Sequence, residues 1–144
     1  MLKISTKGQY GLLLMTTLAK TAESNPEAYT PLKSLAHSHN ISAKYAEQIV
    51  NLLKKNELLD VLRGNSGGYK LNRSAKEYTA GEILRAMEGD LNPKGDLPCH
   101  PVTNSGNIDF WKGFEQSINS YVDGITLEQI VQRSKADDSY IYVI

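Results

Sequence analysis

The stretch VLRGNSGGYKL, residues 61–71, sets one arginine and three glycines between two short runs of β-favouring residues. Glycine is kept where a chain must turn with a positive φ or must let another group approach closely. The flanking runs LLDVLR and YKLN therefore predict two strands joined by a glycine-rich turn, which is a β-hairpin. A nucleotide-binding phosphate loop is excluded, because the glycine spacing is wrong and the stretch leads into a strand rather than a helix.

A helix-turn-helix pattern precedes this hairpin. The segment LKSLAH, residues 32–37, predicts a short helix with Thr30 as its N-cap and Pro31 at its first position. Asn40 then suits the left-handed conformation of a tight turn. Ser42 is predicted to cap a third helix, whose apolar residues fall on one face. Two helices separated by a tight turn and followed by a hairpin predict a winged helix.

Two capping boxes mark further helices on either side of this unit. Thr6 with Gln9 predicts the start of an apolar first helix. Thr79 with Glu82 predicts another helix, which should stop at Gly89. The expected fold class is therefore mainly α with a small β-hairpin: a winged helix-turn-helix with a long additional helix behind it.

The rear of the chain has a different character. Residues 89–107 contain three prolines and three glycines and predict a long irregular loop. Beyond it, large apolar residues recur at three- and four-residue steps and predict a long helix with an apolar stripe. We predict that this stripe is a dimer interface; packing on its own domain is the alternative. Its members are Ile108, Trp111, Phe114, Ile118, Tyr121 and Val122.

Thr126 and Gln129 predict one last short helix. The expected organisation is a domain over 1–88, the loop, and a dimerisation helix with a tail over 108–144.

Charge and composition narrow the class of partner. The 144 residues have a net charge of zero, but residues 1–76 carry eleven Lys or Arg against five Asp or Glu, a net charge of +6. The remaining residues carry −6, so a polyanion is expected to bind the front half only. No stretch approaches the roughly 18 apolar residues of a membrane span, so no membrane partner is expected. A single cysteine, Cys99, fits a reducing compartment such as the cytoplasm.

The third predicted helix presents a polar side suited to reading DNA. Base contacts are expected from its opening, SAKYAEQ over residues 42–48, because a helix that enters the major groove reads base edges near its N-terminus. An ordinary solvated helix face is the alternative. Arg63 at the hairpin is expected to enter the minor groove, where the concentrated negative potential attracts a guanidinium. The predicted partner is double-stranded DNA, bound as an inverted repeat by a two-fold dimer.

Three stretches carry a resemblance to a known family: KISTKGQYGLLLMTTLAK, LKSLAHSHNISAKYAEQIV and VLRGNSGGYKLNRSAKEYTAGEILRAMEG. Together they resemble the Rrf2 family of bacterial transcription regulators, with the spacing intact from Lys3 to Gly89. The resemblance implies a homodimeric winged-helix DNA-binding protein, usually a repressor, with a sensor loop ahead of its dimerisation helix. By position it implies DNA contacts from Ser42, Lys44, Tyr45, Glu47 and Gln48 in the third helix and from Arg63, Gly64 and Gly67 in the wing. Gln9 departs from the pattern, since many relatives carry a basic residue there.

The loop departs from the family pattern more strongly. Many members hold an iron–sulfur cluster there through three cysteines, whereas this loop offers only Cys99 with His100 beside it. No cofactor and no metal are therefore expected. The alternatives for Cys99 are a passive loop residue, a redox-sensing thiol, or a ligand in an iron–sulfur or nitric-oxide sensor.

The last residues, SYIYVI, together with the missing cluster cysteines, resemble the branch of the family that controls cysteine metabolism. That resemblance implies cysteine synthase as a partner, because the cleft of this enzyme also accepts a C-terminal isoleucine from serine acetyltransferase. Ile144 is predicted to imitate that terminus. The alternative is that residues 140–144 form a short strand or hook that completes the dimer.

Two other classes of protein fit the sequence less well than a DNA-binding regulator. An enzyme is not expected, because His37, His39 and His100 lie in turn or loop contexts with no nucleophile and base at recognisable spacing. A protein-interaction adaptor that borrows the fold without binding DNA is the remaining alternative. Retention on DNA that falls steeply with salt separates the regulator from the adaptor.

Overall fold

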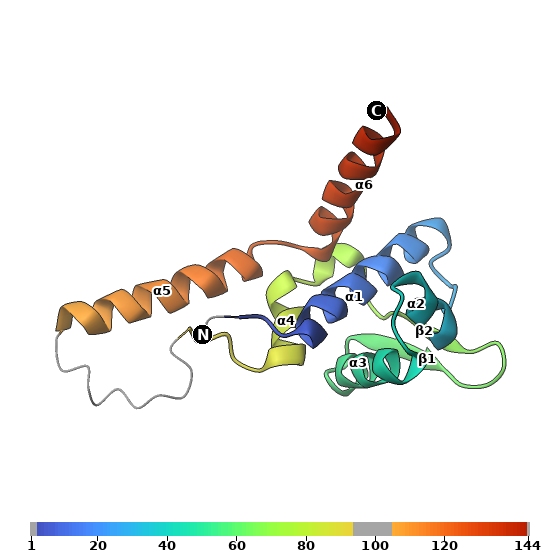
Figure 1. Ribbon diagram of the computed structural model, residues 1–144, viewed down its shortest axis with the longest axis horizontal. Helices are drawn as coiled ribbons and strands as arrows, with labels where there is room; N and C mark the ends of the chain where they lie inside the picture. The colour runs from blue at the N-terminus through green and yellow to red at the C-terminus, as the bar shows by residue number, and fades with distance from the viewer. Residues whose placement is uncertain (1–2, 94–104, 144) are drawn as a thin grey trace.

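The computed structural model describes residues 3–93 and 105–143. Its elements follow the chain in the order α1 (Thr6–Ser24), α2 (Leu32–Ser38), α3 (Ala43–Lys55), β1 (Leu59–Leu62), β2 (Gly68–Leu71), the 3-10 turn η1 (Ala75–Glu77), α4 (Ala80–Glu88), α5 (Ser105–Asp123) and α6 (Leu127–Val143). Helices dominate and the two strands form one hairpin, which confirms the predicted fold class (Figure 1). Within the described ranges, no helix combines the length and apolar character needed to span a bilayer.

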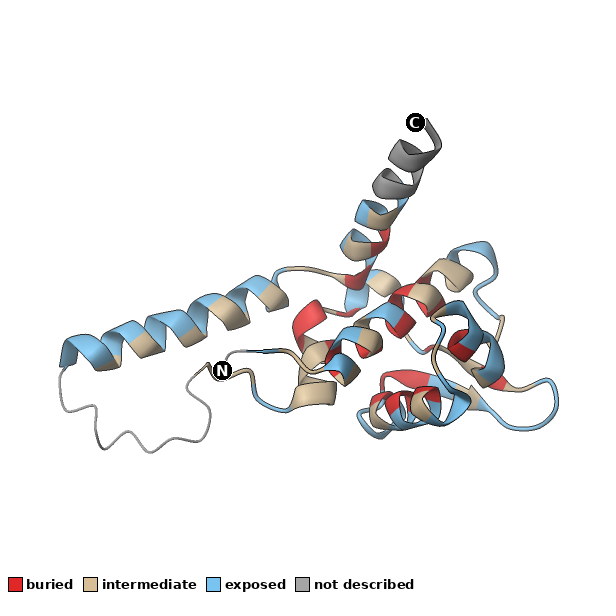
Figure 2. Cartoon of the chain, viewed as in Figure 1, coloured by how far each residue is buried: buried red, intermediate tan, exposed pale blue. Residues whose placement is uncertain are grey.

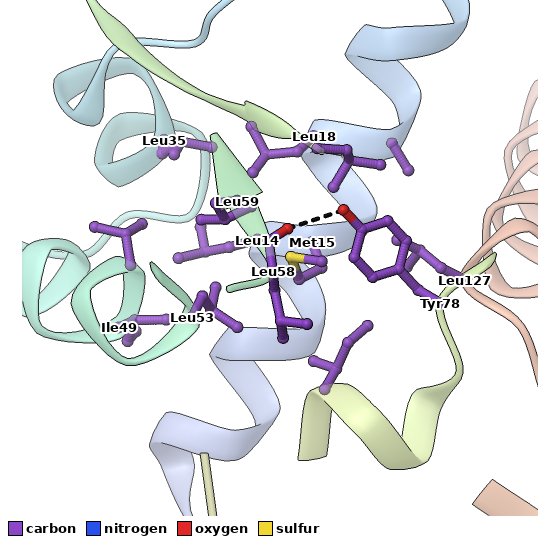
Figure 3. Close-up of a cluster of buried hydrophobic side chains, with 14 of the residues drawn as sticks. Leu14, Met15, Leu18, Leu35, Ile49, Leu53, Leu58, Leu59, Tyr78 and Leu127 are labelled. Carbon is purple, nitrogen blue, oxygen red and sulfur yellow. Dashed lines mark hydrogen bonds between the residues drawn. The ribbon is translucent and has the colours of Figure 1, made fainter. Parts of the chain in front are cut away.

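One hydrophobic core joins α1 to the elements around it. The largest fully buried side chains come from α1, α2, α3, α4, the start of α6 and Leu58 just before β1, and Leu14 and Leu18 of α1 lie among them (Figures 2 and 3). Tyr78 is also fully buried, and its hydroxyl lies 2.9 Å from the Leu58 carbonyl oxygen and accepts the backbone N–H of Asn72 at 2.9 Å. Burial raises the pKa of Tyr78. This hydroxyl therefore ties the strand ends to the segment that leads into α4.

A third segment, at Thr30, pairs with the hairpin, and the sequence analysis did not predict this pairing. β1 and β2 pair antiparallel, with Leu59 opposite Leu71. Thr30 adds an isolated bridge to Tyr69, with reciprocal backbone hydrogen bonds of 2.8 and 2.9 Å. The prediction that Thr30 caps α2 was wrong: Pro31 occupies the N-cap position, because the backbone of Thr30 is already paired with β2.

The first helix begins one residue earlier than the predicted capping box implies. Ser5, not Thr6, is the N-cap of α1, and its hydroxyl oxygen accepts the N–H of Gly8 at 3.1 Å. Gln9 instead donates from its side chain to the Ile4 carbonyl oxygen. Ser5 also donates from its backbone N–H to Glu88 at 2.9 Å and from its hydroxyl to the same carboxylate oxygen, so α4 holds the start of α1 in place.

The last two helices leave this body in different directions. Helix α5 projects from α4 at the opposite end of the molecule from the hairpin, and none of its residues is buried (Figures 1 and 2). Thr126 and Gln129 do form the predicted capping box at the start of α6. The helix is not short, however, and its backbone continues to Val143, so the alternative of a terminal strand is wrong. Leu127 and Val131 are buried and anchor the start of α6. Once a helix has started, each further residue adds a hydrogen bond, and this propagation outweighs the strand preference of the last residues.

Candidate nucleic-acid interface

Helix α3 separates its apolar and polar residues onto two faces. Ser42 caps the helix, because its hydroxyl oxygen accepts the backbone N–H of Tyr45 at 3.0 Å, as predicted. The residues Ala46, Ile49, Val50 and Leu53 are buried in the core. The residues Lys44, Glu47, Gln48, Asn51, Lys54 and Lys55 are exposed. The helix therefore keeps a continuous row of hydrogen-bonding side chains available for a partner.

The turn ahead of α3 sets the direction of this helix. Asn40 has a φ of 53°, which confirms the predicted left-handed residue. His39 lies beside it, with Nε2 2.8 Å from the Thr17 hydroxyl oxygen of α1. Partial burial lowers the pKa of His39, so the neutral ring is favoured in the folded protein. This contact fastens the helix-turn-helix to the central helix.

The structure divides the five predicted contact residues of α3 into two groups. Lys44, Glu47 and Gln48 are exposed along the polar face. Ser42 uses its hydroxyl for the cap, and Tyr45 is half-buried, with its ring edge-on to Tyr10 at a centroid distance of 5.8 Å. The first three side chains are therefore free to read base edges. Tyr45 can present only part of its ring, because the rest packs on α1.

The glycines of the hairpin have three separate structural causes. Gly64 adopts a φ of 110°, which side chains with a Cβ rarely tolerate. A Cβ on Gly67 would lie 2.0 Å from the Leu62 carbonyl oxygen, and one on Gly68 would lie 2.3 Å from the Thr30 carbonyl oxygen. The turn and the third pairing partner thus explain all three glycines. Neither explains Arg63, whose side chain is exposed at the turn.

Helix α3 and the hairpin meet on one side of the body. Burial raises the pKa of Tyr69 in β2, and the carboxylate of Glu47 in α3 raises that pKa further. The polar face of α3 therefore begins close to the hairpin (Figure 1). The predicted recognition helix and the strands of the predicted wing are therefore neighbours in the fold.

Helix α5 carries an aromatic surface broader than the predicted stripe. Four stripe residues are half-buried: Ile108, Trp111, Ile118 and Val122. Phe114 and Tyr121 are 36% and 66% exposed. The sequence prediction missed Phe110, which is 60% exposed and lies 6.0 Å from Phe114 and 5.0 Å from Trp111 between ring centroids. Its four-residue spacing to Phe114 was the signal that could have found it.

Two predicted site residues lie outside the described residues, namely Cys99 and Ile144. Their predicted roles, as a redox thiol and as a cysteine synthase contact, stay predictions. The DNA contacts of α3 and the hairpin and the pairing of α5 also stay predictions.

A helix-turn-helix with an exposed polar recognition helix and a hairpin beside it defines a winged-helix DNA-binding protein. Comparison with known proteins identifies the family within this class. The family model Rrf2, described as an iron-dependent transcriptional regulator, matches residues 4–133. The chain belongs to the Rrf2 family of transcription regulators.

The chain is similar to three members of this family in particular. The transcriptional regulator CymR of Bacillus subtilis is 34% identical over 144 residues, which cover 99% of this chain and 100% of CymR. The solved structure of this CymR, the global cysteine regulator of that organism, has a TM-score of 0.79, and the match covers 92% of this chain and 98% of the CymR chain. An IscR from T. potens has a TM-score of 0.73 at 33% identity and covers 92% of this chain and 88% of its own. The oxidised form of Staphylococcus aureus CymR has a TM-score of 0.72 at 34% identity. The match covers 90% of this chain and 95% of the CymR chain.

The iron in the family description does not fit the donors of this chain. Iron–sulfur clusters are held by several thiolates, and the sequence holds one cysteine, Cys99. Among the side chains that the structure describes, those of residues 3–93 and 105–135, no three from His, Cys, Asp or Glu gather in a way that could hold a metal ion. An iron–sulfur cluster is therefore not supported by the residues present.

Proposed function

We propose that this regulator is a dimeric repressor that binds an inverted repeat, with α3 in the major groove and the hairpin in the adjacent minor groove. The observation that carries the proposal is the exposed row of Lys44, Glu47 and Gln48 beside a hairpin that presents Arg63. Each hydrogen-bonding side chain in such a row can read base edges, and the guanidinium suits a narrow groove. The charge of +6 over residues 1–76 supports the same partner.

The proposal of a dimer rests on α5. A helix that buries none of its residues and exposes Phe110, Phe114 and Tyr121 leaves apolar surface in water. A second copy of the same helix covers such a surface with matching aromatic side chains. A two-fold axis through this contact relates two α3 helices, and an inverted repeat has the same symmetry.

The proposed regulon serves cysteine and sulfur metabolism. The support is the full-length similarity to CymR, the global cysteine regulator of Bacillus subtilis. Genome-wide capture of the DNA bound by this chain would supply the operator and test the regulon together. Cysteine synthase stays the proposed partner, on the resemblance of the C-terminal residues alone.

Binding to the captured operator is expected to weaken steeply with salt. The interface side presents the cations Lys44, Lys54, Lys55 and Arg63. With about eight such cations in a dimer, the logarithm of the binding constant should fall with a slope of about −7 against the logarithm of salt concentration. A filter-binding or anisotropy titration between low and moderate salt measures this slope. A scrambled duplex of equal length should show weaker binding with a similar slope, whereas salt-indifferent flow-through from a DNA column would support the adaptor.

A regulator that responds to oxidation through Cys99 is the second candidate. The observation in its favour is that Staphylococcus aureus CymR, to which this chain is similar, has a solved structure of its oxidised form. A thiol can be oxidised reversibly and then reduced, so one cysteine is sufficient for such a switch.

Protein purified without oxygen is expected to hold negligible iron, because one thiolate per chain is an incomplete ligand set for a cluster. Iron and sulfide assays on the fresh protein check this. Stoichiometric iron and sulfide that disappear in Cys99→Ser would contradict it. In the same samples, peroxide that weakens operator binding by the parent but not by Cys99→Ser would establish the oxidation-responsive alternative.

A further inference from the structure

The base of α5 is held by one arginine of α4. Arg85 donates from Nη1 to Asp123 Oδ1 at 2.7 Å and from Nη2 to Asp123 Oδ2 at 2.8 Å. The same Nη2 donates to Asn119 Oδ1 at 2.6 Å. A two-pronged arginine–carboxylate pair fixes direction as well as distance. The guanidinium holds the pKa of Asp123 below its usual value, so the pair is charged at neutral pH.

The same cluster reaches the start of the predicted loop. Asn119 donates from its side-chain amide to the Leu91 carbonyl oxygen at 3.0 Å and to the Glu115 carbonyl oxygen at 2.9 Å. One amide group therefore connects α5 to Arg85 through its oxygen and to Leu91 through its nitrogen. We name Arg85, Asn119, Asp123 and the Leu91 carbonyl the Arg85 clasp.

The close approach of α4 to the clasp depends on a glycine. Gly81 lies on the side of α4 that faces the end of α5, and a Cβ there would fall 2.1 Å from Asp123 Oδ1 and 2.9 Å from Arg85 Nη1. Glycine at this position thus lets the carboxylate sit against the helix. A larger residue would push Asp123 away and open the clasp while leaving both of its charged groups present.

A second attachment lies next to the clasp and acts as a pivot. The backbone N–H of Ala80 donates to the Ile125 carbonyl oxygen at 2.8 Å, and that of Leu127 donates to the Tyr78 carbonyl oxygen at 3.0 Å. These bonds hold the turn between α5 and α6. If the pivot were the only attachment, α5 could rotate about it. The pivot and the clasp together fix the direction in which α5 leaves the body.

We propose that the Arg85 clasp is a positioning device that sets the angle between α5 and the winged helix. The effect of this angle on DNA binding rests on the proposed dimer. If α5 pairs with its copy, the angle sets the separation of the two α3 helices. Helix α5 is about 28 Å long, so a rotation of ~10° at its base moves its far end by ~5 Å. That displacement exceeds the rise of about 3.4 Å between neighbouring base pairs. The clasp then specifies the spacing of the two half-sites.

The angle can be measured within one chain, without DNA. Spin labels on Lys44→Cys in α3 and Lys112→Cys in α5, in a Cys99→Ser background diluted with unlabelled protein, report the intrachain distance distribution. Both lysines are exposed. The parent should give one narrow distribution. Arg85→Gln and Gly81→Ala should each broaden it or shift it by about 3 Å, because Lys112 lies about 17 Å along α5 from Asp123 and a rotation of ~10° at the base displaces it by that amount.

Arg73→Gln is the matched control. Arg73 pairs with Glu82 at 3.1 Å, and its side chain is 32% exposed, against 33% for Arg85, but this pair does not involve α5. The control should therefore leave the distance distribution as in the parent. Distributions that are identical in the parent, Arg85→Gln and Gly81→Ala would overturn the proposal, since a merely stabilising pair changes the melting temperature alone.

A second measurement joins the clasp to DNA recognition. Duplexes that carry the captured operator with one base pair added or removed between its half-sites should bind the parent less well than the native spacing. In both clasp variants this preference should shrink by on the order of fivefold or more, as expected for coupling through a positioning element. A preference that is unchanged in both variants would also overturn the proposal. If the parent itself binds no inverted repeat, the proposed function is wrong. The intrachain distances would still test whether the clasp sets the angle of α5.

Discussion

Phe114→Asp is expected to turn the dimer into a monomer and to weaken operator binding by about 10²- to 10⁴-fold, the loss that follows when two linked contacts become one. Phe114 is 36% exposed, and the ring contacts that the described part of the chain gives it are with its own helix: it stacks on Phe110 and meets Trp111 edge-on. A carboxylate at this position is hydrated in the monomer. In the dimer it would be buried without a partner, which costs several kcal/mol.

Sedimentation equilibrium and a gel-shift titration measure the two parts of this prediction. Gln116→Asp is the matched control, because Gln116 is exposed on α5 but lies away from the aromatic surface. That variant should remain a dimer with operator affinity near that of the parent. Phe114→Asp protein that sediments as a dimer and binds the operator like the parent would show that the aromatic surface of α5 is not the interface.

Local sequence signals were sufficient for most of the winged helix. The left-handed Asn40, the cap on α3 by Ser42 and the end of α4 at Gly89 are each decided within one turn of the chain. The hairpin was predictable for a similar reason, since runs of β-favouring residues on either side of a glycine-rich turn favour two paired strands.

Contacts between distant segments were not predictable in this way. Thr30 satisfies every local rule for a helix cap, but pairing with Tyr69, which is 39 residues away, places it in the sheet. The Arg85 clasp joins residues 38 positions apart, and an arginine and an aspartate at that separation give no periodic signal. The same holds for Gly81, whose role depends on the approach of Asp123 and not on a turn.

Arg63→Ala is expected to weaken specific operator binding by about 1 to 3 kcal/mol, or roughly 5- to 150-fold, with little change in folding stability. Arg63 is exposed at the hairpin turn, where the glycines are required by the backbone and not by the arginine. Next to it, Gly64 has no atom within 4 Å of the position a Cβ would occupy, so the turn is open to a partner. A narrow minor groove concentrates negative potential and would hold the guanidinium there.

Two further variants separate the charge of Arg63 from its shape. Arg63→Lys keeps the charge but loses the planar fork of donors, so it should recover only part of the lost affinity. Lys76→Ala removes an exposed cation from η1, which is not part of the proposed interface, and should leave the gel-shift midpoint near that of the parent. If Arg63→Ala weakens binding to operator and scrambled duplexes equally, the guanidinium contacts phosphate and does not read sequence. If it changes neither, the hairpin does not enter the groove, and its glycines serve only the turn and the pairing with Thr30.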